Sequence, residues 1–228
     1  METTTTKGDS SVTYIAFFDL DLTLAGAISG RSLAKKAAAS GLMKPGDLVI
    51  ALLSGLLYRL RIADPVKIVG KMTSWVKGAP AEYLQKLADE VNNEIMFPAI
   101  FKDAYKEVNM HKAAGARTVI LSSSLFPICR AVADHMGIDD VICSELEVEN
   151  GLLTGKPKGN LCFGNEKLVR LKAYCEKNNS PLAEAWYYGD ALVDAPALGI
   201  VGNPVCVNPD KKLKKLAIEK NWTIYLWK

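Results

Sequence analysis

The chain has 228 residues, of which 49% are hydrophobic and 23% are charged, and its formal net charge is +3. These values are ordinary for a soluble globular protein, and the length suits one large α/β domain or a domain with a modest insertion. So small a charge gives no reason to expect a nucleic-acid partner. The five cysteines include no CxxC pair, which argues against a disulfide framework or structural zinc site and predicts a reducing, cytoplasmic location.

Two segments bear on targeting and on membranes. Residues 1–13 are polar and lack an apolar core, so we predict a disordered lead-in rather than a signal peptide. The most apolar window, Leu48–Leu57, is about half as long as a membrane span, and it is followed by Arg59 and Arg61. We predict a buried helix here, with an interfacial helix as the alternative, and no stable membrane insertion.

The stretch YIAFFDLDLTL joins an apolar run to two carboxylates. Tyr14–Phe18 predicts a buried central strand, and Asp19, Asp21 and Thr23 follow directly. Open α/β sheets bind ligands at the carboxyl ends of their strands. Two carboxylates this close repel each other unless a cation lies between them, and Mg²⁺ prefers carboxylates, water and a substrate phosphate as ligands. The plain alternative is that both are turn residues.

The region after this stretch predicts an inserted helical domain. Residues 25–97 contain only helical patterns, and the next strand pattern is Arg117–Leu121. A crossover between parallel strands needs only about a dozen residues, so the excess indicates an insertion. We therefore predict an α/β core of residues 14–24 and 98–228. The helices predicted in the insertion span 32–40, 48–60, 65–76 and 80–95.

The remainder of the chain alternates between helices and strands. Asn150-Gly151, flanked by alternating apolar residues, predicts a β-hairpin over 145–154. The alternation predicts a doubly wound, Rossmann-like and mostly parallel sheet. The other predicted helices are 98–114, 126–136, 166–178 and 211–220, and the other strands are 140–143, 183–188, 204–207 and 222–226.

Three further polar clusters fall at predicted strand or helix ends. Ser122–Ser124 follows a strand and offers a hydroxyl and free amides for phosphate before the next helix. Lys167 lies near a helix start, where an anion would have to compensate for the helix dipole. Asp190 ends a strand within GDALVD, and Asp194 lies a helical turn further on. The alternatives are a helix cap, a solvated lysine and an N-cap aspartate.

Together these groups suit phosphoryl transfer. A nucleophilic carboxylate, an acid/base, phosphate donors, a fixed cation and a metal site would all meet at one edge of the sheet. A serine nucleophile with a histidine base is set aside, because His111 and His135 both lie within predicted helices and no GxSxG elbow surrounds Ser122.

The order of these groups resembles the four motifs of the haloacid dehalogenase superfamily. The matching parts of this chain are FDLDLTL, Ser122, Lys167 and GDxxxD. The phosphoserine-phosphatase-like branch (subfamily IB), with a helical C1-type cap after the first motif, is the most similar branch. The resemblance extends from Tyr14 over nearly the whole chain, and includes the hairpin ELEVENGLLTGK and the terminal VNPD segment with its following tryptophan.

The resemblance implies a phosphomonoester hydrolase. Asp19 would attack phosphorus and become an aspartyl-phosphate, and Asp21 would protonate the leaving oxygen and then activate water. The implied Mg²⁺ ligands are the Asp19 carboxylate, the Asp21 main-chain carbonyl and Asp190, with Asp194 supporting the metal-bound waters. The implied phosphate-binding residues are Ser122, Ser123 and Lys167.

The insertion departs from the phosphoserine phosphatases of this branch, which use a cap glutamate to meet the substrate ammonium. Residues 22–46 contain no Asp or Glu. We therefore expect a small-molecule phosphate ester with an apolar or anionic remainder rather than phosphoserine, and the candidate cap residues are Arg31 and Arg59.

Three alternatives remain open at this point. A phosphotransferase or mutase would use the same nucleophile with an alcohol in place of water. A signalling phospho-receiver would also use Asp, Mg²⁺, a hydroxyl and Lys, although the long insertion argues against it. A membrane-surface binding protein would use the apolar window 48–57. The sequence leaves the oligomeric state open.

Overall fold

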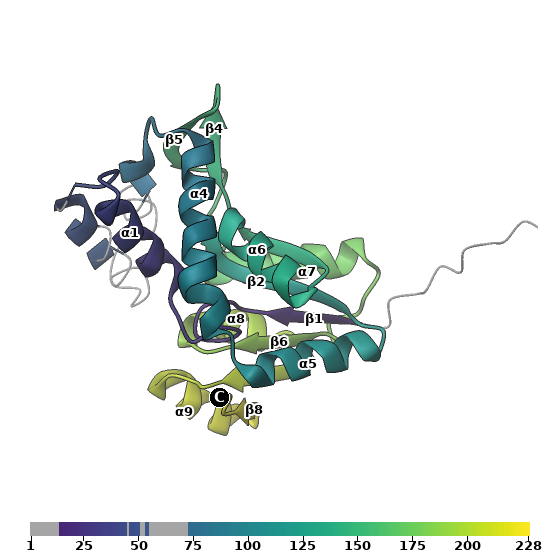
Figure 1. Cartoon of the computed structure of the whole chain (residues 1–228). Coiled ribbons are helices and arrows are strands. Elements are labelled where there is room, and N and C mark those ends of the chain that lie inside the picture. The colour runs from purple at the N-terminus through teal and green to yellow at the C-terminus, as the bar shows by residue number, and fades with distance from the viewer. Residues whose placement is uncertain (1–13, 45, 51–52, 55–72) are drawn as a thin grey trace, which may run out of the picture.

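The computed structural model describes residues 14–44, 46–50, 53–54 and 73–228. At its centre is a six-stranded parallel sheet in the order β3-β2-β1-β6-β7-β8 (Figure 1). The first strand, β1, therefore lies in the interior of the sheet, between β2 and β6. The strands are β1 (Ile15–Phe18), β2 (Arg117–Leu125), β3 (Asp140–Ser144), β6 (Trp186–Gly189), β7 (Asn203–Val207) and β8 (Thr223–Tyr225).

Helices cover both faces of this sheet. Ala16 and Phe18 of β1 belong to one apolar core, whereas Ile15 and Phe17 belong to the other, because successive side chains of a strand point to opposite faces. Both faces of β1 are thus buried, which explains its unbroken apolar sequence. The first core includes side chains of α5 (Lys102–Ala113) and α6 (Phe126–Met136); the second includes those of α7 (Asn165–Lys177), α8 (Ala195–Leu198) and α9 (Lys211–Lys220).

Most of the described residues between β1 and α5 form helices. In Figure 1, α1 and α4 lie beside each other, away from the sheet's far edge at β8. Residues 46–50 and 53–54 are also helical, whereas most of the predicted helices 48–60 and 65–76 fall outside the described residues. The other elements are α1 (Ser29–Ala39), the 3₁₀ turns η1 (Ser74–Val76) and η3 (Phe97–Ala99), α4 (Ala81–Val91) and the π-helical turn η2 (Asn92–Met96).

The chain leaves the sheet and returns to it along neighbouring paths. Ala25 and Ile100 form an antiparallel bridge. Gly26 N donates to Ala99 O at 2.8 Å, and Phe101 N donates to Leu24 O at 3.0 Å. These contacts join the two ends of the helical segment next to the carboxyl end of β1.

The predicted hairpin is present as β4 (Leu146–Glu149) and β5 (Leu152–Pro157). Asn150 and Gly151 adopt φ angles of 49° and 80°, which are the left-handed values of a tight hairpin turn. Backbone hydrogen bonds join β5 to the helical segment: Gly78 N donates to Leu153 O at 2.8 Å, and Leu153 N donates to Ala79 O at 2.9 Å. The hairpin therefore connects the core to the helices.

Several predicted boundaries were wrong, and two of them concern β2 and α5. β2 continues through the three serines to Leu125, so Ser123 and Ser124 are part of a strand rather than free groups before the helix. Its register against β3 shifts between Leu121 and Leu125, but Leu125 still pairs with Ser144, so the chain stays extended until Phe126 begins α6. The helix predicted to begin at Pro98 begins at Lys102, because Ile100 and Phe101 are extended.

The predicted fold class is confirmed: an α/β, doubly wound, parallel sheet accompanied by a helical region and a β-hairpin. Among the described residues, no helix combines the length and apolar character required to cross a bilayer.

Candidate active site

The first candidate residue, Asp19, directly follows β1. Its amide donates to Tyr188 O of β6 at 2.9 Å, and its Oδ1 accepts a hydrogen bond from Leu20 N at 2.8 Å. Leu22 has a φ of 62°, a left-handed value that costs a non-glycine residue about 1 kcal/mol or more. The backbone therefore turns sharply between Asp19 and Thr23. Left-handed non-glycine residues such as Leu22 cluster at functional sites.

Three buried carboxylates converge at the carboxyl ends of β1 and β6. Oxygen atoms of Asp19, Asp190 and Asp194 lie within 4.8 Å of one another, and all three side chains are buried. A Cβ at Gly189 would lie 2.9 Å from Asp194 Cβ, so only glycine permits this approach. Asp194 belongs to the 3₁₀ turn η4 (Leu192–Asp194), one turn after the strand, as GDxxxD predicts.

Lys167 brings a positive charge into this cluster. Its side chain is only 2% exposed, and its Nζ lies 2.9 Å from Asp19 Oδ2 and 2.7 Å from Asp194 Oδ1. Burial alone would lower the pKa of Lys167, but the two carboxylates outweigh it and keep the pKa well above its usual value. The alternative of a solvated surface lysine is therefore wrong.

The cluster fits a divalent cation. Three carboxylates against one ammonium leave uncompensated negative charge in a buried site, and burial raises the pKa of Asp19 although Lys167 opposes the rise. A hard cation with oxygen ligands would remove that imbalance. Asp19, Asp190 and Asp194 are the described side chains that could bind it.

Ser122 also contacts Asp19. Its side chain is fully buried, and its hydrogen bond to the Asp19 carboxylate favours the ionised form and lowers the pKa of that group. Register explains the contact: Phe18 of β1 pairs with Ile120 of β2, so the residues after each lie at the same edge. Ser123, the next candidate, is partly buried in β2.

Asp21 has different partners from Asp19. Ser29, the first residue of α1, donates its backbone N to Asp21 Oδ1 at 3.1 Å and its Oγ to Asp21 Oδ2 at 3.0 Å. Ser29 Oγ also lies 2.6 Å from Ser124 Oγ. Burial raises the pKa of Asp21 to about 6, although the hydrogen bonds from Ser29 oppose the rise. Asp21 thus links the loop after β1 to the first turn of α1.

Sequence reasoning missed Ser29, Ser124 as its partner, and Tyr187. Tyr187 is a fully buried residue of β6 whose hydroxyl contacts Lys167 and Asp194. The only sequence signals were a serine near a predicted helix start and a tyrosine within a predicted strand, and neither pattern reveals a contact with residues far away in the chain.

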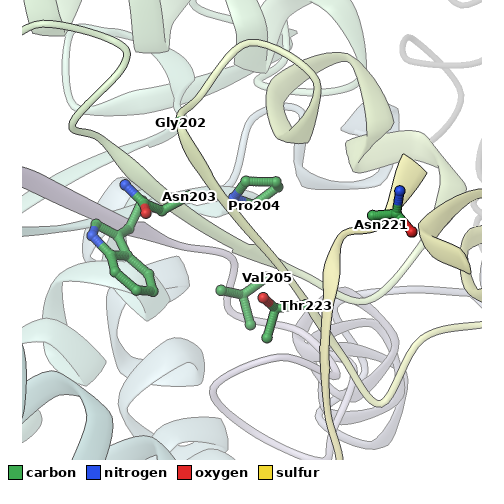
Figure 2. Close-up of a pocket in the computed structure, with 7 residues that line it drawn as sticks. Gly202, Asn203, Pro204, Val205, Asn221 and Thr223 are labelled. Atoms are coloured by element: carbon green, nitrogen blue, oxygen red, sulfur yellow. The ribbon is translucent and has the colours of Figure 1, made fainter.

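Of the two candidate cap residues, the structure describes only Arg31. Arg31 is exposed on α1, two residues after Ser29, and Arg59 lies outside the described residues. A cavity of about 170 Å³ is lined by Trp186, Asn203 and Thr223 among others. Figure 2 shows Asn203 and Thr223 at this cavity. Trp186, Asn203 and Thr223 begin β6, β7 and β8, so this cavity lies at the amino edge of the sheet, opposite the carboxylates.

Residues 16–199 match the family model of haloacid dehalogenase-like hydrolases. The chain belongs to this family. It is 25% identical over 217 residues to a phosphoserine phosphatase of Mycobacterium tuberculosis, covering 93% of this chain and 70% of that protein. It is 31% identical over 151 residues to a histidinol-phosphatase of Neisseria meningitidis, covering 64% and 68%.

The fold agrees with this assignment. A phosphoserine phosphatase solved as a phospho-aspartyl intermediate analogue superposes with a TM-score of 0.72 at 18% identity, covering 94% of this chain and 93% of that one. The protein is thus a haloacid dehalogenase-family phosphatase whose sequence and fold resemble those of phosphoserine phosphatases, and the predicted resemblance is confirmed.

Proposed function

We propose that this phosphatase hydrolyses a small-molecule phosphate monoester through an aspartyl-phosphate on Asp19, with Mg²⁺ as its cofactor. The observation that carries the proposal is the placement of the Asp19 carboxylate. It lies 2.9 Å from Lys167 Nζ and shares a site with Asp190 and Asp194. A nucleophilic carboxylate thus lies beside both a fixed cation and a candidate metal site, as phosphoryl transfer requires.

The reaction then proceeds in two displacements. A carboxylate oxygen of Asp19 attacks phosphorus, the bond to the ester oxygen breaks, and Asp21 gives its proton to the leaving alkoxide. A water molecule then attacks the same phosphorus while Asp21 takes a proton from it, which releases phosphate and restores the Asp19 carboxylate. A pKa of about 6 at Asp21 suits both steps, because each protonation state is accessible near neutral pH.

Other residues neutralise the transferring group. In this proposal Lys167 and the Ser122 and Ser123 groups bind phosphoryl oxygens, where negative charge is spread in the transition state. The Asp19 carboxylate, the Asp21 carbonyl and Asp190 would hold Mg²⁺, and Asp194 would orient its waters. The ion would supply further charge neutralisation to the phosphoryl group.

We propose residues 25–97 as a cap that selects the substrate. The first turn of α1 carries no acidic residue, and residues 22–46 contain none, so nothing there would bind an ammonium group. Arg31 and Arg59 would favour an anionic or apolar remainder instead. The two named relatives act on different esters, and we expect kcat/KM for phosphoserine to fall below that for the best ester lacking an ammonium group.

The test is phosphate release from a panel of monoesters, with Mg²⁺ or with EDTA. We expect Mg²⁺-dependent turnover by the wild type, none by Asp19→Asn, and wild-type turnover by the control Asp89→Asn, which changes an aspartate of α4 bonded to Gln85. Turnover that survives in Asp19→Asn would contradict the assigned nucleophile. An added acceptor alcohol separates the alternatives, because a phosphotransferase would form a new phosphate ester.

A further inference from the structure

Lys167 uses all three of its hydrogen-bond donors within the protein. An ammonium group has three N–H bonds and no acceptor. The described partners of Nζ are Asp19 Oδ2 at 2.9 Å, Asp194 Oδ1 at 2.7 Å and the Tyr187 hydroxyl at 3.2 Å. The direction of the ammonium is therefore fixed by these three oxygen atoms together.

The Tyr187 hydroxyl closes this arrangement into a ring. Its single proton is donated to Asp194 Oδ1 at 2.8 Å, so its oxygen accepts from Lys167. Nζ also lies 5.9 Å from the centre of the Tyr187 ring, within the range of a cation–π contact. One hydroxyl thus orients both the cation and the carboxylate nearest to it.

We propose that Tyr187 is a positioning residue, whose hydroxyl holds Lys167 and Asp194 in the arrangement that the transition state requires. This inference rests on the function proposed above, in which Lys167 would turn one N–H from Asp19 to a phosphoryl oxygen while Asp194 and Tyr187 keep the other two. Without the hydroxyl, Lys167 keeps its ion pairs but gains freedom to turn about them. The loss would be felt mainly in the transition state, where charge on the phosphoryl oxygens must meet fixed donors.

Tyr188 provides a matched control. It is the next residue of β6, is also fully buried, and its hydroxyl is also hydrogen bonded, to Glu107 and His111 on the opposite face of the sheet. Tyr187→Phe and Tyr188→Phe therefore remove the same group from equally buried positions. Only the first removes it from the active site.

The experiment measures unfolding, kcat, KM and inhibition by orthovanadate, which mimics a five-coordinate phosphorus, for the wild type and both variants with Mg²⁺. For Tyr187→Phe we expect kcat/KM to fall about 10- to 100-fold, mostly through kcat, as for the loss of a group that orients a site residue. The inhibition constant of orthovanadate should rise by a similar factor. For Tyr188→Phe we expect both constants within about twofold of the wild type, even if its stability falls further.

Two results would overturn the inference. In the first, the wild type is active, and Tyr187→Phe and Tyr188→Phe have the same kcat/KM and the same inhibition constant for orthovanadate. The other is failure of both Tyr187→Phe and the more flexible Tyr187→Met to fold, which would assign the hydroxyl a structural role. A folded wild type that hydrolyses no ester in the panel would instead overturn the proposed function, and with it this inference.

Discussion

A buried polar network lies on each face of the central sheet. Tyr187 of β6 belongs to one network, and the next residue, Tyr188, belongs to the other. On one face, Tyr187 contacts Lys167 and Asp194, and Lys167 forms ion pairs with both Asp194 and Asp19. On the other face, Tyr188 joins His111 at 2.7 Å. Because successive side chains of a strand point to opposite faces of the sheet, Tyr187 lies in an ionised network and Tyr188 in a neutral one.

The second network is satisfied without a buried ion pair. Tyr188 donates to Glu107 Oε1 at 2.6 Å, so it accepts from His111 Nε2, and His111 Nδ1 accepts from the Tyr14 hydroxyl at 2.9 Å. Burial lowers the pKa of His111 to about 4, so the ring is neutral at physiological pH. This network connects α5 to β6 and fixes the packing of that face.

The contrast separates polar groups that stabilise the fold from polar groups that serve chemistry. Burying charges is costly even when they are paired, whereas a satisfied neutral network adds rigidity at less cost. The first network is therefore expected to be sensitive to any change of charge, and the second to a change of pH.

The largest effect is expected from Lys167→Met, which leaves Asp19 and Asp194 without their cation. Stability should fall by about 3–5 kcal/mol, the usual result of removing one partner of a buried pair, and turnover should be lost. Added Mg²⁺ should recover part of the stability, because the ion would replace the missing charge. Urea unfolding with and without Mg²⁺ measures both effects.

The control for this change is Lys172→Met, on the exposed side of α7. It should alter stability by less than about 0.5 kcal/mol, as surface changes usually do. Equal stability of the two variants would refute the view that the ion pair holds the cluster together.

A smaller effect is expected from Ser29→Ala, which extends the comparison to Asp21. The variant removes the hydroxyl bonded to Asp21 and Ser124 but keeps the backbone donor. We expect kcat to fall about tenfold with a stability change near 1 kcal/mol, the size of a lost hydrogen bond. Ser40→Ala removes a comparable hydroxyl, bonded to Ala37 O, from the other end of α1. If both variants lower kcat alike, Ser29 does not act through Asp21.

The smallest effect on turnover is expected from His111→Gln, which tests the neutral network. The pKa of His111 is about 4 in the folded protein and about 6.5 in the unfolded chain. Between these two pH values, His111 therefore binds a proton more strongly in the unfolded chain. The contribution of His111 to stability should therefore be complete above about pH 6.5 and fall toward pH 4, by at most about 1.4 kcal/mol per pH unit. His111→Gln should flatten this decline and leave turnover at neutral pH unchanged.

Urea unfolding between these two pH values measures the slope. His135→Gln removes the other histidine from an exposed position on α6, so it serves as the comparison. A slope that changes equally in both variants would show that His111 is not its source.

The parts of the site that were predictable follow strand ends. Asp19, Ser122 and Asp190 each come directly after an apolar run, and parallel strands carry such residues to one edge of the sheet. Lys167 was predicted from its place at a helix start, although only the structure shows its complete burial. The fold class followed from the alternation of strands and helices.

The missed residues make contacts that no spacing encodes. Ser29 reaches Ser124 across 95 positions, and Tyr187 reaches Lys167 across 20. Each depends on which face of an element meets which neighbour, and the sequence pattern gives periodicity without partners. The length of β2 was mispredicted for a related reason, because its last residues stay extended through pairing with β3.

The hydrogen bonds that pair the chain near Leu24 with the chain near Phe101 bear on how residues 25–97 can vary. The backbone leaves and re-enters the sheet through adjoining hydrogen bonds, and a Cβ at Gly26 would lie 3.1 Å from the Phe101 ring, so the two paths are closely packed. The register of β1 is set by its pairing with β2 and β6, so the length of the segment that starts and ends at this pair does not determine it. In the function proposed above, changes in this segment away from Ser29 would alter substrate selection and leave Asp19, Lys167 and Asp194 in place.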